Sequence, residues 1–432
     1  MRRIYSKFAA IVILVFLLIT PHGSLLGQSG DDLMEIRIAL IGPGDELYFW
    51  WGHIGLIIDD HLTASSRFYD WGIFSFDNEN FFVNFALGRL LYTCGVSPPD
   101  WNYQHYVNTN RDIILYTLNL PLEKKREVQR FAEWSILPEN KDYFYHHFRD
   151  NCATRLRDIL DMAVDGQFKE RYNNEPGRFS LRQHVYRHTW FNPFFDWILS
   201  FWMSRVIDTP ITVWDEMFLP SEIALRIQEF SYIDPNGFER NMVSNVETRF
   251  QSQNRPIVLD IPRLQWPGSL TLGCIMALLF LLLRFIKSQE DKPGLKKLWA
   301  LAQGFFGLFF GFAGLMLFFM MFFTDHDYTY NNINIFFANP LLIAALPMGI
   351  CYYKAPSPID RSKWELIIKT FWTCFLVLCL ISILLNQLPF FRQQNQLDLT
   401  LILPSLVALS WLPDFFVYIR REYLWRWFTM LT

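Results

Sequence analysis

Phe148-Arg149-Asp150-Asn151-Cys152-Ala153-Thr154-Arg155-Leu156-Arg157-Asp158-Ile159-Leu160 is the stretch around which the rest of the chain is organised. Its apolar side chains recur at helical spacing after Cys152, and either Asp150 or Asn151 suits the N-cap, so the sequence predicts a helix that contains Cys152 in its first turn. Free N–H groups and the positive end of the helix dipole favour a thiolate there, and Arg155 adds positive charge. The alternative is a buried, unreactive cysteine, which the charged neighbours make less suitable.

A candidate base lies about a hundred residues earlier, in Trp51-Gly52-His53-Ile54-Gly55. A cysteine nucleophile needs a base within hydrogen-bond reach and a third group that orients the base. His53 begins a predicted strand, and its flanking glycines leave room for a close approach. Asp70 on the neighbouring predicted strand is the candidate third residue, and His61, on the turn between the strands, is its competitor. Alone, His53 also fits a core histidine; its pairing with a cysteine favours catalysis.

Hydrophobic residues are unevenly distributed along the chain. The protein has 432 residues, of which 51% are hydrophobic and 18% aromatic, with a formal net charge of −3 and a pI near 6.3. This even charge balance argues against a nucleic-acid partner. Residues 1–262 have soluble, aromatic-rich character after a short apolar start, whereas residues 267–418 contain five long apolar runs.

The first residues have the pattern of an export signal. Met1 to Lys7 is basic, and the apolar core that follows ends at Thr20, a length typical of a signal peptide and short for a membrane span. We therefore predict a signal peptide or signal anchor at residues 1–27 and an exported domain over residues 31–262. Because no cysteine follows the signal, we expect that the protein is not itself a lipoprotein.

Two of the six cysteines, Cys94 and Cys152, fall in the exported part. A disulfide between them is possible in an oxidising compartment and would remove the nucleophile. The spacing gives no paired framework and no C-x-x-C metal motif. His184 and His188 stand at i and i+4 on a possible helix, but without an H-E-x-x-H context a structural role is favoured over metal ligation. We predict no metal and no cofactor.

Short runs of alternating or continuous apolar residues predict strands in the exported part, at 34–42, 53–58, 66–72 and 112–120. The second and third form a plausible hairpin, and residues 74–82 and 85–92 are expected to pack aromatic side chains around it. A helix with a charged outer face is predicted over 122–137. Residues 170–262 are expected to be mostly helical with irregular joints.

Each apolar run of the second half is near the length of about 20 residues that spans a bilayer. The runs lie at about 270–286, 298–323, 335–351, 366–385 and 399–419, and the third is short and interrupted by two prolines. The loops at 284–297 and 354–363 are rich in Lys and Arg and should face the cytoplasm, whereas those at 324–334 and 388–398 should face outward. Five spans entered from outside end with a cytoplasmic C-terminus.

Several motifs together resemble a known family. They are Trp51–Gly55, Phe68–Phe76, Asp150–Asp158, Trp214–Pro220, Asp325-His326 and Asn332–Pro340. A histidine on an early strand, a polar residue on the next and Asn-Cys opening a later helix looks like the circularly permuted papain-like fold of the NlpC and LRAT-like superfamily. More specifically, the chain resembles the Lnb family of lipoprotein N-acyltransferases of Bacteroidota-type bacteria. This implies an α+β permuted papain-like periplasmic domain, followed over residues 267–432 by an all-α five-helix transmembrane bundle in the inner membrane.

The resemblance also implies an acyltransfer reaction. The Cys152 thiolate would take an acyl chain from a membrane phospholipid, with His53 as base and Asp70 as the third residue. The thioester would then acylate the α-amine of the diacylglyceryl-cysteine that begins a lipoprotein, and the backbone N–H of Cys152 would help to bind the oxyanion. The candidate substrate-binding residues are Asn151, Arg155 and His326. The outward loop that contains the last of these would contact lipid headgroups, or else be a solvated connector.

Two other functions fit parts of the sequence. A peptidoglycan amidase or peptidase would use the same Cys152 and His53, but it would not need five membrane helices. A non-catalytic envelope sensor or assembly protein would need neither side chain, and Cys152→Ala would leave its function intact.

Overall fold

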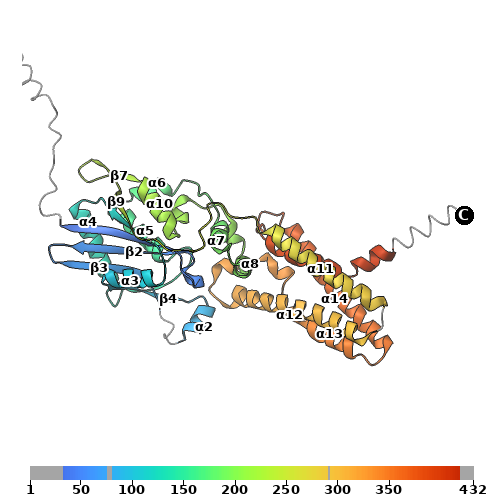
Figure 1. Cartoon of the computed structure of the whole chain (residues 1–432). Helices are drawn as coiled ribbons and strands as arrows, with labels where there is room; N and C mark the ends of the chain where they lie inside the picture. The colour runs from blue at the N-terminus through green and yellow to red at the C-terminus, as the bar shows by residue number, and fades with distance from the viewer. Residues whose placement is uncertain (1–32, 75–79, 290–291, 419–432) are drawn as a thin grey trace, which may run out of the picture.

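A computed structural model describes residues 33–74, 80–289 and 292–418, and the predicted signal at residues 1–27 lies outside them. Figure 1 shows a sheet flanked by helices in the N-terminal part and an elongated bundle of helices in the C-terminal part. Between the two lie α7 (Leu181–Thr189) and α8 (Pro193–Trp202). The fold therefore places the predicted exported domain against one end of the predicted membrane bundle.

The N-terminal part is built on a seven-stranded antiparallel sheet with the strand order β6-β4-β3-β2-β1-β5-β9. The strands are β1 (Met34–Ile41), β2 (His53–Asp60), β3 (Ser65–Ile73), β4 (Leu91–Ser97), β5 (Ile113–Leu118), β6 (Asp142–Phe144) and β9 (Val243–Phe250). All four predicted strands are confirmed, and β2 pairs with β3 as the predicted hairpin. Every residue of β2 between its two ends is buried, because helices cover both faces of the sheet.

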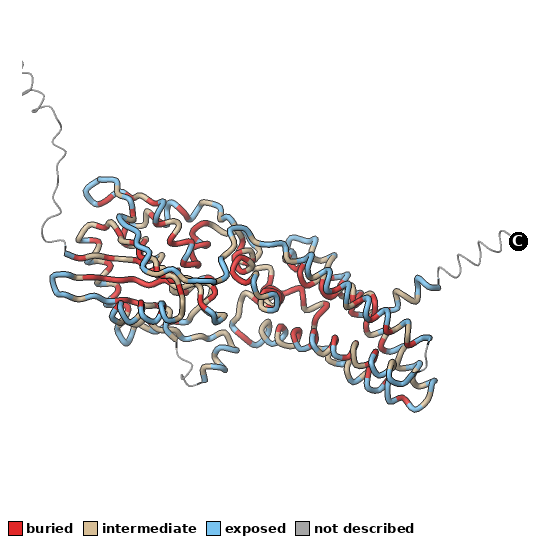
Figure 2. The backbone as a smooth tube through the Cα atoms, in the orientation of Figure 1, coloured by how far each residue is buried: buried red, intermediate tan, exposed pale blue. Residues whose placement is uncertain are grey.

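One face of the sheet is covered by the helices α4 (Leu122–Ser135), α5 (Cys152–Ala163) and α10 (Pro220–Glu229). On the other face, Tyr103 and Tyr106 of α3 (Pro99–Asn108) pack into a smaller core. Figure 2 shows buried backbone along the central strands. This arrangement confirms a mixed α and β class with an antiparallel sheet; the permuted papain-like assignment stays a prediction.

The expectation that residues 170–262 are mostly helical is wrong for residues 231–250. These form the hairpin of β7 (Ser231–Ile233) and β8 (Glu239–Asn241), followed by β9, which pairs with β5 at the edge of the main sheet. The side chains of β9 are mostly polar and exposed, so hydrophobic periodicity carries no signal there. Pairing with β5 decides its structure. The remaining short elements of this part are η1 (Leu47–Phe49), α2 (Phe81–Ala86), α6 (Gln167–Tyr172), η2 (Arg205–Asp208) and α9 (Val213–Glu216).

The C-terminal part contains four helical segments that are long and apolar enough to cross a membrane, or five if a bent pair counts as one span. Three are continuous: α11 (Trp266–Gln289), α12 (Pro293–Phe323) and α14 (Pro358–Leu385). The third predicted span is broken into η4 (Ile333–Phe336), η5 (Pro340–Ala344) and α13 (Ala345–Lys354). The last consists of α15 (Gln396–Leu409) and a further helix at residues 412–418, bent by 52°.

Glycines on α12 allow the broken span to pack closely against it. A Cβ at Gly311 would lie 2.6 Å from the backbone nitrogen of Ile343, and one at Gly307 would overlap the side chain of Ala345. Such small residues let helix backbones approach inside a bilayer, where packing replaces the hydrophobic effect as the driving force. The broken span is therefore supported by α12 in spite of its prolines.

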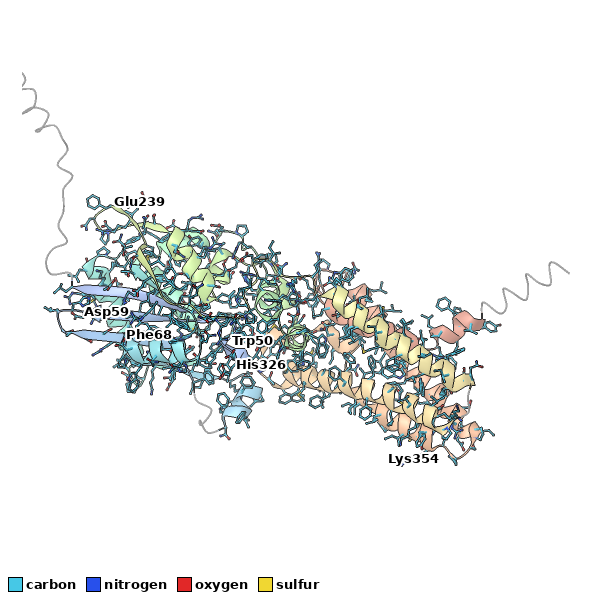
Figure 3. All side chains as sticks on the ribbon, in the orientation of Figure 1. Trp50, Asp59, Phe68, Glu239, His326 and Lys354 are labelled. Carbon is cyan, nitrogen blue, oxygen red and sulfur yellow. The ribbon has the colours of Figure 1, made fainter. Side chains whose placement is uncertain are left out.

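The two ends of the bundle differ in charge as predicted. Arg284, Lys287 and Lys369 pair with Asp414 or Glu365 at one end of the bundle, and Figure 3 labels Lys354 at that same end, far from the sheet. His326 is labelled at the opposite end, where the outward loop meets the sheet domain (Figure 3). The positively charged loops thus lie on the side away from the sheet domain, in agreement with the positive-inside rule.

Candidate active site

Cys152 is the first residue of α5, as the sequence predicts, and Asn151 is the N-cap. The Asn151 side-chain oxygen accepts the N–H of Thr154 at 2.9 Å, and the Thr154 hydroxyl accepts the N–H of Asn151 at 2.8 Å. The Asn151 amide also donates to the carbonyls of His147 and Phe218, at 2.7 and 3.0 Å. This side chain therefore fixes the start of the helix, where free N–H groups converge on the half-buried Cys152 thiol.

The pairing of β2 with β3 brings His53 and Asp70 together. The His53 Nε2 lies 3.0 Å from the Asp70 Oδ1, an ion-pair contact, and the same oxygen accepts the N–H of Gly72 at 2.6 Å. A bulge between Asp70 and Ile73 interrupts the register with β4, and such bulges re-aim the neighbouring side chains. A Cβ at Gly72 would lie 2.5 Å from the His53 Cε1, so the absence of that atom makes room for the ring.

Charge interactions hold the His53 ring in its protonated form. Burial on its own lowers the pKa of His53, but the Asp70 carboxylate and the Cys152 thiolate, by charge and by hydrogen bonding, outweigh it and raise that pKa above its ordinary value. Burial likewise works to raise the pKa of Asp70, but the His53 ring and the Gly72 N–H bring it below its ordinary value. A cationic His53 ring beside Cys152 can stabilise negative charge on the sulfur when it reacts.

Cys152 and His53 line one small cavity of about 60 Å³. Trp51 also lines it, and Figure 3 labels the neighbouring Trp50 where the sheet domain meets the bundle. A space of this size admits a reacting carbonyl group rather than a whole substrate, since one water occupies about 30 Å³ of liquid. The other lining residues, most of them aromatic, are Tyr48, Phe49, Gly52, Gly72, Phe74, Tyr92, Tyr145, His147, Asn151, Phe218, Leu219 and Pro220.

The loop that follows α12 is attached to the turn that precedes Cys152. Asp327 accepts from the His146 Nε2 at 3.0 Å and from the Arg149 Nη1 at 2.9 Å. The His146 Nδ1 in turn accepts the N–H groups of Phe148 and Arg149, at 3.2 and 3.1 Å. A carboxylate from the membrane part therefore orients the side chain that holds this turn. The sequence pointed to an outward loop but gave no indication of this contact.

Two of the predicted substrate-binding residues lie outside the cavity described above. Arg155 forms a bidentate pair with Asp150, at 2.7 and 2.9 Å, and its guanidinium lies 4.0 Å from the centre of the Tyr143 ring. The His326 Nδ1 is 3.1 Å from the Tyr328 hydroxyl, and burial lowers the pKa of His326 in spite of nearby carboxylates. Arg155 therefore supports the start of α5, and His326 lies at the junction with the bundle.

The structure also decides between the alternatives that the sequence left open. His61 is exposed at the far end of the eight-residue β2, roughly 25 Å along the strand from His53, so Asp70 is the residue at the histidine. Cys94 is a free thiol buried in the core, and Cys152 is also free, so they form no disulfide. The buried His184 is 3.0 Å from the Glu216 carboxylate, and His188 contacts the backbone of α7, which are structural roles.

Among the polar or aromatic residues of the cavity wall that sequence reasoning missed are Tyr92, Tyr145 and His147. The Tyr92 and Tyr145 rings stack 4.3 Å apart, and the Tyr145 hydroxyl lies 3.4 Å from the His147 Nδ1. The available signal was position: His147 stands five residues before the nucleophile in a stretch rich in aromatic residues. From the sequence alone, that stretch cannot be distinguished from aromatic residues that pack in the hydrophobic core.

Comparison with protein families gives two matches. Residues 29–187 match a model described as the Lnb N-terminal periplasmic domain, and residues 267–412 match one described as the Lnb transmembrane domain. No curated protein and no solved structure matches the chain. The two models together cover more than half of the chain, and they describe an inner-membrane protein with a periplasmic N-terminal domain.

Proposed function

Because the chain belongs to the Lnb family, we propose that it transfers an acyl chain from a membrane phospholipid to the N-terminus of diacylated lipoproteins. The observation that supports this most directly is that Cys152 and His53 line one cavity, with the Asp70 carboxylate 3.0 Å from the His53 Nε2. Nucleophile, base and orienting carboxylate are the parts that thiol-based acyl transfer needs. Both substrates of the proposed reaction reside in the outer leaflet, next to this cavity.

In the first half of the reaction, the Cys152 thiolate attacks the carbonyl carbon of a phospholipid ester. The new sulfur–carbon bond pushes the carbonyl electrons onto oxygen, and the resulting oxyanion lies beside the N-terminal N–H groups of α5. When this intermediate collapses, the ester carbon–oxygen bond breaks and the leaving lysophospholipid oxygen takes a proton from the His53 imidazolium. The products are an acyl thioester on Cys152 and a neutral His53.

In the second half, the α-amine of the diacylglyceryl-cysteine attacks the thioester. The neutral imidazole of His53 takes the proton that the attacking amine must lose, and the sulfur leaves as a thiolate. The thiolate charge is one of the causes that raise the pKa of His53, and formation of the thioester removes that charge. The pKa of the ring therefore falls, and the neutral ring can accept a proton from the amine. The amide product leaves, and the thiolate and imidazolium are restored.

The proposal gives the other predicted residues defined roles. Asn151 and Arg155 support the start of α5, while His326 lies at the junction where lipid headgroups would be bound. We further propose that residues 31–262 form a permuted papain-like catalytic domain and that residues 267–432 cross the membrane five times. The order of histidine strand, aspartate strand and cysteine helix supports the first of these, and the bent last segment supports the second.

The experiment is expression of the full chain in a bacterial host that lacks its own lipoprotein N-acyltransferase. Mass spectrometry of a lipoprotein N-terminal peptide then counts the acyl chains. We expect the wild-type protein to convert diacylated into triacylated lipoprotein and Cys152→Ala or His53→Ala to abolish the conversion. Cys274→Ala, which removes an exposed cysteine of α11, is the matched control and should be fully active.

An unchanged acyl count on expression of the intact protein would refute the proposal. Cleavage of purified peptidoglycan that depends on Cys152 would instead favour the amidase alternative. If Cys152→Ala complemented as well as the wild type, the protein would act without this nucleophile, as a sensor or an assembly protein would.

A further inference from the structure

Apart from the His53 Nε2, which faces the Asp70 carboxylate at 3.0 Å, two polar ring atoms in the wall of the cavity that contains Cys152 have no hydrogen-bond partner among the described residues. They are the Nε1 of Trp51 and the Nε2 of His147, both buried. Their side chains line the cavity together with Cys152, and their ring centroids lie 4.8 Å apart. An unsatisfied buried polar group is destabilising, because it has lost its hydrogen bonds to water without gaining a partner. Two of them in one small cavity indicate that a group with acceptor capacity binds between them during the reaction.

The surroundings of His147 fix the position of its single ring proton. Burial, with a smaller effect of the neighbouring His146, lowers the pKa of His147 to about 4, so the ring is neutral near pH 7. A neutral imidazole has one N–H donor and one acceptor nitrogen. Burial also raises the pKa of Tyr145 far above its usual range, so that hydroxyl keeps its proton. The Tyr145 hydroxyl lies 3.4 Å from the His147 Nδ1. A hydrogen bond donated by that hydroxyl to Nδ1 leaves the His147 proton on Nε2, the tautomer in which Nε2 is a donor.

We propose that the Nε1–H of Trp51 and the Nε2–H of His147, together with the backbone N–H of Cys152, bind the oxyanion formed from the acyl carbonyl. This assignment rests on the proposed function. Both half-reactions pass through such an oxyanion, so the same donors serve the ester and the thioester. The donors keep their protons throughout, and the electron pair on oxygen returns to carbon when the ester or thioester bond breaks.

A neutral imidazole and an indole are suitable for this task. Donors that are already in place in a water-poor cavity stabilise developing charge without reorganising, and removal of one such donor typically lowers a rate about 10²- to 10³-fold. A neutral histidine that donates to a developing oxyanion is an established enzymatic device. A protonated His147, by contrast, would add a charge beside the His53 imidazolium and weaken the thiolate pair.

The test compares two reactions of Cys152 in the full chain, reconstituted in vesicles of phosphatidylethanolamine and phosphatidylglycerol. Mass spectrometry measures the rate at which Cys152 becomes acylated, and a parallel experiment measures its alkylation by iodoacetamide, a displacement that forms no oxyanion. We expect Trp51→Phe and His147→Leu each to slow acylation about 10²- to 10³-fold and to leave alkylation unchanged. His147→Gln, which restores an N–H donor, should recover part of the acylation rate.

Trp50→Phe is the matched control. Its indole N–H donates to the Asp45 carbonyl at 3.0 Å, outside the cavity, so its loss should change neither rate. Unchanged acylation in both Trp51→Phe and His147→Leu overturns the assignment. A fall in the rates of both acylation and alkylation would also overturn the assignment, because it would show that the substitution displaced the Cys152 sulfur. If the wild-type protein forms no acylated Cys152 in these vesicles, the proposed function itself has failed.

A different observation supports a second inference, about the short helix α2. Three of its apolar side chains are largely exposed: Phe82 at 72%, Val83 at 56% and Phe85 at 54%. The chain just after α2 is bound to the end of α12, because Asp325 donates its N–H to the Leu87 carbonyl at 2.8 Å and pairs with Arg89 at 2.6 Å. Figure 1 shows α2 beside that end of α12.

The end of α12 gives the depth at which α2 lies. This helix is a candidate membrane span, and its last residues, Phe322 and Phe323, are 63% and 61% exposed. Exposed phenylalanines therefore lie both at the end of a span and on the helix attached to it. Isolated apolar residues on a protein surface need no explanation, but several gathered at the end of a membrane span do.

We infer that α2 inserts its exposed face into the outer leaflet, among the upper acyl-chain segments of phospholipids. Its half-buried side, which carries Phe81, leads towards the catalytic cavity. The rings of Phe81 and Phe74 stack 6.1 Å apart, and those of Phe74 and Tyr92 lie 5.1 Å apart; Phe74 and Tyr92 also line the cavity that contains Cys152. The helix thus joins the lipid surface to the place where an acyl group must arrive.

The test uses the native full chain in phosphatidylethanolamine vesicles doped with a phospholipid that carries a photoreactive diazirine on one acyl chain. After irradiation, peptide mass spectrometry locates the adducts. We expect adducts on α2 as well as on the spans, and none on the β7–β8 hairpin, where Phe238 is 58% exposed on the far side of the sheet domain. Adducts confined to the spans overturn the inference.

Discussion

The Nε2 of His146 lies 3.0 Å from the carboxylate of Asp327, a contact between residues 181 positions apart in the sequence. It joins the periplasmic end of the membrane bundle to the turn that begins the cysteine helix. Because the other nitrogen of His146 accepts two backbone N–H groups of that turn, the carboxylate determines how the turn is held. The membrane part therefore supports the geometry of the nucleophile as well as anchoring the domain.

Asp327→Asn should consequently slow acylation of Cys152 by about tenfold, which corresponds to the loss of roughly 1.4 kcal/mol from a charge-assisted contact. Glu133→Gln is the control. Its pair with Arg67 is about half exposed on both sides, and an exposed ion pair contributes little. The measurement is the rate of acyl-enzyme formation in vesicles. Equal effects of the two substitutions would show that Asp327 has no special connection with the turn.

Gly72→Ala should reduce activity by displacing the ring of His53, the proposed base. The new Cβ would lie 2.5 Å from the His53 Cε1 and 3.1 Å from the Asp70 Oδ1, so the pair must move apart by a fraction of an ångström or more. A displacement of about 1 Å in a catalytic group lowers a rate by about 10²-fold. Gly268→Ala adds a methyl group with no atom within 4 Å and is the control. Acylation at the wild-type rate in Gly72→Ala would contradict the described position of His53.

Asp70→Asn should change the pH dependence of stability. The raised pKa of His53 means that its ion pair with Asp70 contributes fully below the unfolded histidine value of about 6.5 and is lost as the pH rises through the folded pKa. The lowered pKa of Asp70 means that the contribution is present above about pH 3.9 and is lost in stronger acid. The difference in unfolding temperature between the wild type and Asp70→Asn should therefore be largest near pH 5 to 6 and smaller at alkaline pH.

The same comparison in a Cys152→Ser background isolates the contribution of the carboxylate, because the thiolate that also raises the pKa of His53 is then absent. Calorimetry of the detergent-solubilised full chain gives the unfolding temperatures. If the difference in unfolding temperature instead increased as the pH rose, its sign would be opposite to the one expected for the His53–Asp70 ion pair. That result would rule out a stabilising contribution from this pair.

Asn151→Ala should lower both stability and activity. It removes a helix cap, which typically contributes about 1 kcal/mol, and it deprives the partly buried His147 carbonyl and the buried Phe218 carbonyl of their Asn151 donor. Ser180→Ala removes the matching cap of α7, which is part of a similar capping box but does not line the cavity. Both substitutions should lower the unfolding temperature, but only the first should slow acylation. If they slow acylation equally, Asn151 acts through stability alone.

Local patterns predicted most of the elements that form the site. Strand alternation located β2 and β3, helical spacing and a polar cap located α5, and apolar run length located the spans. These signals work because each depends on residues that are near one another in sequence. The polar edge strand β9 was missed for the converse reason, since backbone pairing with a distant strand determines it.

The amino-acid sequence by itself determined which side chains are available: a cysteine at a helix start and a histidine at a strand start, ahead of long apolar runs. Only the tertiary structure decided which groups meet that sulfur. The choice of Asp70 over His61, the two unpartnered ring nitrogens in the cavity and the reach of Asp327 to His146 all come from packing between segments far apart in the chain. No local periodicity encodes such contacts, because burial and charge act through space rather than along the backbone.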